Sequence, residues 1–100
     1  WEGSHDIMRR ALESALGKMA PADWIETDLT DVYQQARKRC FDQCRRVELH
    51  ARPGETYLAH RLSLHGVAPW GKAAAAGPDG RMICYFRPEL PDPAAWLSLP

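Results

Sequence analysis

The chain has 100 residues, of which 45% are hydrophobic and 26% are charged, and its 13 basic and 13 acidic side chains cancel to a formal net charge of zero. This is the composition of a folded domain, and it argues against both a disordered segment and the overall basic field that recruits nucleic acid or anionic lipid. No apolar run approaches the ~20 residues that a membrane-spanning helix needs. We therefore predict a soluble, cytoplasmic protein with no nucleic-acid or membrane partner.

Two amphipathic helices are predicted in the first half of the chain. The first starts at His5, behind an N-cap at Ser4, and ends at the breaker Gly17. The second opens at Thr30 and Asp31. Apolar residues recur at helical spacing in both segments: Ile7, Ala11, Leu12, Ala15 and Leu16 in the first, and Val32, Tyr33, Ala36, Cys40 and Phe41 in the second.

The hydrophobic period changes to two from residue 46 onward, which is typical of strands. We predict strands over 46–51, 56–64 and 81–86, separated by a turn at 53–54 and a loop over 66–80. Because the helices precede the strands and do not alternate with them, an antiparallel α+β arrangement is favoured over a parallel sheet.

The C-terminal tail and the cysteines give two further expectations. The proline-rich tail over 89–100 is predicted to be extended, with Trp96 and Leu97 anchoring it to the body. The odd number of cysteines favours reduced thiols, and a structural zinc site is not expected because Cys40 and Cys44 lack a second close pair of ligands. We interpret these cysteines as small buried hydrophobes.

Three segments, in this order, carry a resemblance to a known family: WEGSH at 1–5, RPGETYLAHRLSLHGVAPW at 52–70 and GRMICYFRPE at 80–89. They resemble the C-terminal part of the phytanoyl-CoA dioxygenase family of Fe(II)/2-oxoglutarate-dependent oxygenases. In that family a Gly-Asp or Gly-Glu turn leads into a strand, a His-Gly pair, a loop and an arginine that opens the next strand. The resemblance implies a mainly β fold, namely a partial double-stranded β-helix (jelly roll, cupin-like) with two flanking helices.

The resemblance also implies the site residues. His65 matches the second iron-binding histidine, Arg81 matches the arginine that anchors 2-oxoglutarate, and Trp70 is a candidate for lining the mouth of the substrate site. A planar guanidinium suits this task because it can pair with a carboxylate through two hydrogen bonds. The Gly-Ser-His segment that contains His5 is read as a structural link near the active site. The implied reaction is hydroxylation of a small organic substrate.

In the family, a His-x-Asp or His-x-Glu motif supplies the other two iron ligands, and no such motif occurs in these 100 residues. We therefore expect residues 1–100 to be the C-terminal part of a single oxygenase domain whose N-terminal half is missing, and the chain alone to be inactive. An exposed sheet edge would then favour self-association.

Other interpretations of the same residues stay open. His65 can be an ordinary loop histidine, Arg81 an arginine that reaches the surface, and Trp70 a packing anchor. His60 has the opposite strand parity to His65, so we expect it to pack or to support the site. The alternative function is a non-catalytic jelly-roll or cupin-like binding or assembly module, and a small interaction domain is a third possibility.

Overall fold

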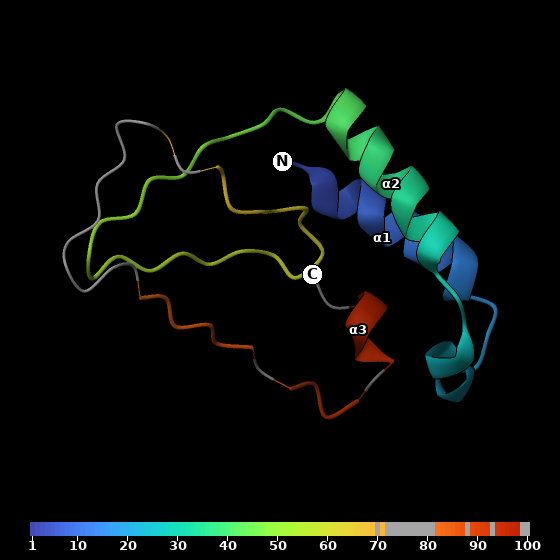
Figure 1. Cartoon of the computed structure of the whole chain (residues 1–100). Coiled ribbons are helices and arrows are strands. Elements are labelled where there is room, and N and C mark those ends of the chain that lie inside the picture. The colour runs from blue at the N-terminus through green and yellow to red at the C-terminus, as the bar shows by residue number, and fades with distance from the viewer. Residues whose placement is uncertain (70, 72–81, 88, 93, 99–100) are drawn as a thin grey trace.

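The computed structural model describes residues 1–69, 71, 82–87, 89–92 and 94–98 (Figure 1). Its elements, in chain order, are the helix α1 (Ser4–Leu16), the 3-10 helix η1 (Pro21–Glu26), the helix α2 (Thr30–Gln43) and the short helix α3 (Ala95–Ser98). The two long helices pack against each other, and α3 packs against α1. None of the described helices is both long and apolar enough to cross a membrane.

Helix α1 forms where the apolar spacing predicts it, with a shift at its start. Gly3, with a φ of 78°, precedes the helix, and Ser4 is the first helical residue instead of its side-chain cap. At the other end the Gly17 N–H donates to the Glu13 carbonyl at 2.8 Å. A Cβ at position 17 would lie only 2.6 Å from that carbonyl oxygen, so glycine is needed where the helix stops.

Helix α2 begins at the predicted residue. The Asp28 carboxylate accepts a hydrogen bond from the Thr30 N–H at 2.8 Å, which satisfies one of the unpaired donors of the first turn. This interaction with Thr30 also lowers the pKa of Asp28 below its usual value. At the end of the helix, the Phe41 ring lies 4.9 Å from the ring of Trp1, so α2 also contacts the start of the chain.

The hydrophobic core lies between the helices and takes in a few residues from later in the chain. Its buried apolar side chains are Ile7, Met8, Leu12 and Leu16 of α1, Ala36 and Cys40 of α2, and Leu62, Leu64 and Leu97. One face of each long helix is therefore buried, as its amphipathic pattern predicts.

The predicted double-stranded β-helix is wrong for the part of the chain that the structure describes. No strand forms there, and Figure 1 shows 45–62, 82–87 and 89–92 as loops that extend to one side of the helices. No face is buried along the whole length of a predicted strand: Leu49 is 69% exposed and Leu58 is fully exposed, whereas Leu62 and Leu64 at the end of 56–64 reach the core. Without a buried face nothing sets the register of a ladder. The helices, predicted to flank a barrel, form the core instead.

Two local predictions in this region are confirmed. Residues 53–54 form a turn, in which Gly54 has a φ of 86° and the Glu55 N–H donates to the Arg52 carbonyl at 3.1 Å. Leu97 anchors the tail in the core. The tail is not wholly extended, however, because Trp96 and Leu97 lie in α3, and the Arg61 guanidinium donates to the Trp96 carbonyl at 2.8 and 3.0 Å.

Candidate functional site

Only one of the three predicted site residues lies in the described part of the chain. Trp70 and Arg81 fall outside it, so their roles stay predictions. His65 is described, and it directly follows the buried Leu64 in a segment without regular secondary structure. Its own side chain is exposed.

One ring nitrogen of His65 is held by a hydrogen bond to the backbone. Its Nδ1 lies 2.8 Å from the carbonyl oxygen of Ser63. Because a carbonyl oxygen can only accept, we infer that Nδ1 carries a proton and donates. In the neutral ring the lone pair is then on Nε2, which is available to a ligand or a metal. Metal-bound histidines commonly have this arrangement, in which the second ring nitrogen donates to a carbonyl group.

The backbone next to His65 is held by the start of the chain. The Leu64 N–H donates to the hydroxyl of Ser4 at 2.8 Å, and the Leu64 carbonyl accepts from the amino nitrogen of Trp1 at 3.0 Å. The Ser4 hydroxyl itself donates to the Trp1 carbonyl at 2.6 Å. The Gly-Ser-His segment thus contacts the residue that precedes His65, whereas the sequence predicts only a helix-capping role for its serine.

A pocket of about 640 Å³ opens beside His65, between α1, the start of α2, the segment 61–65 and α3. Its apolar lining comes from Met8, Leu12, Leu29, Leu62, Leu64 and Trp96. Its polar lining comes from Thr30, Tyr33, Gln34, Arg61, Ser63 and His65. By area the wall is more apolar than polar, as is common for sites that bind small organic molecules. The sequence did not reveal this pocket, because it is assembled from four separate segments.

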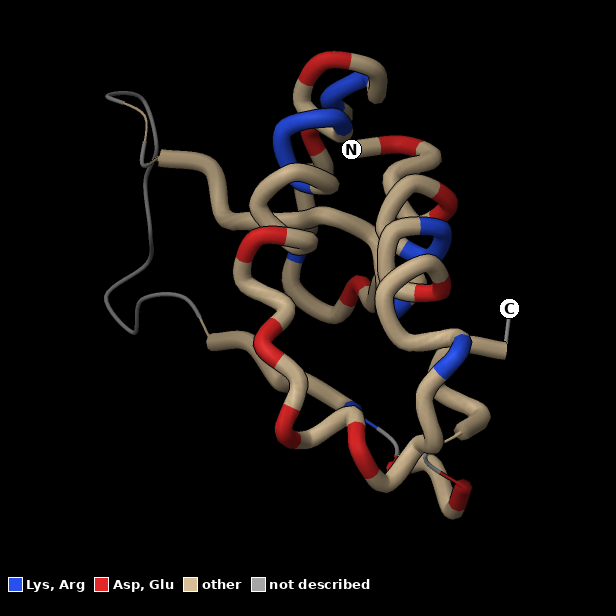
Figure 2. Tube along the Cα trace, turned by 90° about the vertical axis from the view of Figure 1, so that its right-hand side faces the viewer, with Lys and Arg blue, Asp and Glu red and all other residues tan. Residues whose placement is uncertain are grey.

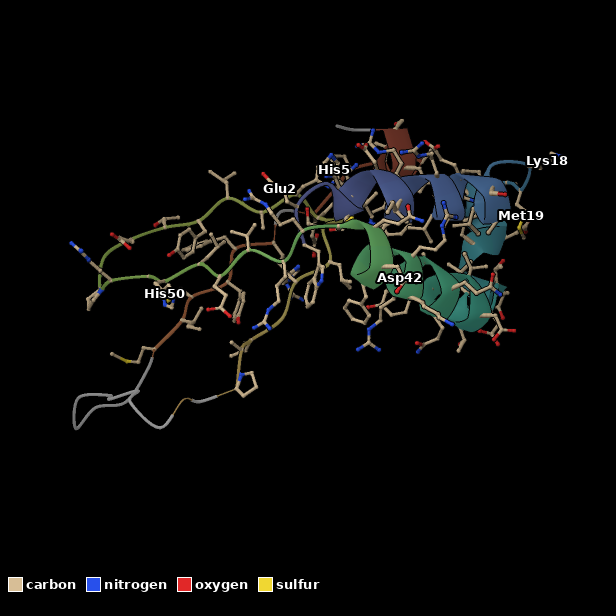
Figure 3. The ribbon with its side chains drawn as sticks, turned by 90° about the horizontal axis from the view of Figure 1, so that it is seen from above. Glu2, His5, Lys18, Met19, Asp42 and His50 are labelled. Atoms are coloured by element: carbon tan, nitrogen blue, oxygen red, sulfur yellow. The ribbon has the colours of Figure 1, made fainter. Side chains whose placement is uncertain are left out.

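The other three histidines make their contacts away from the ring of His65. The His60 ring lies 4.8 Å from that of His5, its Nδ1 accepts from the Leu62 N–H at 3.1 Å, and Arg9 Nη2 lies 3.1 Å from its Nε2. His60 therefore packs against α1, as one of the two expectations for it stated. Figure 3 shows His5 at the start of α1 and His50 far out on the extended segment.

The described residues do not make a complete metal site. Among them, no three His, Cys, Asp or Glu side chains form a group that could hold a metal ion. His65 fits one position of a ligand set made of two histidines and a carboxylate, and the described part of the chain does not supply the other two.

Charges of both signs lie on the long helices. Figure 2 shows acidic and basic residues along both of them, so neither helix presents charge of a single sign. The basic run Arg37–Arg39 is exposed, and Arg37 lies over the ring of Phe41 at 5.1 Å. Arg45 pairs with Glu2 at 2.6 Å, which ties the end of α2 to the start of the chain. These contacts give Arg37 and Arg45 local structural roles.

Comparison with protein-family models, with curated proteins and with solved structures finds no match to this chain.

Proposed function

We propose that this chain is part of an Fe(II)- and 2-oxoglutarate-dependent dioxygenase that hydroxylates a small organic substrate, with His65 as one of its iron ligands. The proposal rests on the resemblance of the three sequence segments. The structural observation that supports it best is the hydrogen bond from His65 Nδ1 to the Ser63 carbonyl, because it leaves Nε2 available on an exposed side chain.

Each residue has a separate part in the proposed reaction. His65 would hold the metal through Nε2, and Arg81 would pair with the distant carboxylate of 2-oxoglutarate through its two parallel N–H groups. When bound, iron and 2-oxoglutarate would let dioxygen act as the oxidant, so that one of its oxygen atoms enters succinate as 2-oxoglutarate loses carbon dioxide and the other enters the hydroxylated substrate. The task of the protein is to orient these groups and the substrate.

The sequence holds no His-x-Asp or His-x-Glu motif, so the two other ligands would have to come from residues outside these 100. A single imidazole binds Fe(II) weakly, because a stable site of this type uses three protein ligands. We therefore expect the 100-residue chain to bind Fe(II) weakly and to turn over nothing. Tight one-to-one binding of Fe(II) to this chain, measured by anaerobic calorimetry, would contradict the proposal.

The pocket beside His65 is the candidate substrate site. Its volume of about 640 Å³ falls within the range of roughly 300–1,000 Å³ that is usual for ligand pockets. Met8, Leu12 and Trp96 would contact the apolar part of a substrate, while Tyr33 and Gln34 carry polar groups that could hydrogen-bond to it. The same pocket would also serve the second candidate function, a binding module without a metal.

Succinate formation separates the two functions. The complete gene product should convert 2-oxoglutarate to succinate in the presence of dioxygen, Fe(II) and ascorbate. His65→Ala should abolish this turnover because it removes a ligand. His50→Ala is the matched control, since His50 is also exposed but does not line the pocket, and it should retain activity. Turnover that survives in His65→Ala would overturn the proposed ligand, and a complete gene product without any turnover would favour the binding module.

A further inference from the structure

We propose that Ser4 is a positioning residue for His65, which it holds through the peptide bond between Ser63 and Leu64. The importance of this role for iron binding rests on the function proposed above. The role itself concerns only the conformation and the protonation of His65, and it is tested without a metal.

Ser4 is placed for this task and not for helix capping. It is the one buried polar side chain among the described residues, with none of its surface exposed. The residue before α1 is Gly3, and no side chain caps this end of the helix. Because the Ser4 hydroxyl proton goes to the Trp1 carbonyl at 2.6 Å, its oxygen lone pairs are left to accept the Leu64 N–H at 2.8 Å.

A single peptide unit connects Ser4 to His65. The N–H of Leu64 and the carbonyl of Ser63 belong to the same peptide bond, which is planar, so the two groups point in opposite directions. Ser4 binds the N–H side, and His65 Nδ1 binds the carbonyl side. When Ser4 fixes the direction of the N–H, it also fixes the direction of the carbonyl that holds the imidazole ring. The two hydrogen bonds also polarise each other through the peptide group.

The consequence for His65 is a defined tautomer. With the Ser63 carbonyl held toward Nδ1, the ring keeps its proton there and presents the Nε2 lone pair. If Ser4 is lost, the buried Leu64 N–H has no acceptor in its present position, and the peptide is free to rotate toward another one. The carbonyl then turns away from Nδ1, and the proton moves to Nε2 in a larger share of molecules. A rotated ring with a protonated Nε2 cannot bind a metal through that atom.

The tautomer can be measured on the 100-residue chain by NMR, from the 15N shifts of the histidine ring nitrogens at a pH where the ring is neutral. The unmodified chain should show His65 with its proton on Nδ1. Ser4→Ala should change the ratio of the two tautomers by about fivefold in favour of Nε2–H, which corresponds to the loss of one hydrogen bond. A folded Ser4→Ala chain with the unmodified tautomer ratio would overturn the proposal.

Two controls separate positioning from a general loss of structure. Ser14→Ala removes an exposed hydroxyl from the same helix and should leave the ratio unchanged. Ser63→Ala keeps the backbone carbonyl and should also leave the tautomer ratio unchanged.

If Ser4→Ala does not fold, hydrogen exchange of the unmodified chain tests the proposal instead. The Leu64 amide should be protected although it lies outside every helix. Exchange at the rate of an unprotected amide would overturn the proposal. A failed succinate assay alone would leave these results standing.

Discussion

The three cysteines lie in three different environments. Cys40 is fully buried in α2, with its thiol 3.8 Å from the Ser4 carbonyl. Burial raises the pKa of the Cys40 thiol, and the neighbouring thiol of Cys44 raises it further. Cys44 is half-buried, and Cys84 is exposed. The interpretation as small buried hydrophobes therefore holds for Cys40, applies in part to Cys44 and is wrong for Cys84.

Alkylation by iodoacetamide near neutral pH should follow this order. Cys84 should react first and Cys40 last, because Cys40 is inaccessible and its raised pKa leaves less of the reactive thiolate at a given pH. Mass spectrometry of the digested chain at successive times measures the three rates. In denaturant the rates should become similar, which serves as the control. Equal rates for Cys40 and Cys84 in the native chain would show that the helix packing described here is wrong.

At the scale of elements, the molecule divides into helices that bury one face and extended segments, namely the loops 45–60, 65–69, 82–87 and 89–92, that do not. Leu16 is 1% exposed at the end of α1, whereas Leu58, in the extended segment 56–60, is fully exposed. Both residues are leucines in segments with a clear hydrophobic pattern. Their different burial shows that the pattern identifies apolar positions but does not ensure that another element covers them.

Substitution of these two leucines tests the division. Leu16→Ala should lower the free energy of unfolding by about 2–5 kcal/mol, because it removes buried methyl groups and leaves a cavity. Leu58→Ala should change it by no more than about 0.5 kcal/mol, as is usual for exposed positions. Urea denaturation followed by circular dichroism measures both values. A large loss of stability in Leu58→Ala would mean that Leu58 is buried in solution, by another part of the chain or by a second copy.

At the scale of the whole molecule, many large apolar side chains lie outside the helical core. In the extended segments the exposed ones include Leu49, Tyr57, Leu58, Val67, Met82, Tyr85 and Phe86. Where exposed apolar side chains gather into one patch, they often mark a site of association. Self-association was predicted through a sheet edge, but the described residues form no sheet. If the chain associates, we therefore expect this set of side chains to form the contact.

The chain should self-associate as its concentration rises, and sedimentation velocity measures the shift toward larger species. The double variant Leu58→Lys, Phe86→Lys should weaken association, because it places two charges on the extended segments. Ile25→Lys is the control, since Ile25 is 87% exposed but belongs to η1. A chain that stays monomeric over the whole range would show that the exposed side chains are not a contact surface.

The helices could be predicted from the sequence because their determinants are local. The hydrogen bonds of α1 and α2 join residues four positions apart, and a signal such as Gly17 acts within one turn. The start of α2 at Thr30, the end of α1 at Leu16 and the turn at 53–54 all follow from neighbouring residues. The choice of His65 as a candidate was also possible from the sequence, although only through a resemblance.

The tertiary structure decided what depends on distant partners. Strands need a second segment to complete their hydrogen bonds, so alternation over 46–51 indicated a tendency that no neighbour among the described residues fulfils. The Ser4 hydroxyl accepts a hydrogen bond from the N–H of Leu64, 60 residues away, and no local rule points to that pair. The pocket beside His65 likewise exists only after four segments have packed together. Local periodicity therefore determined the helices. Long-range packing decided that the described residues form no sheet, where the pocket lies, and how the backbone next to His65 is held.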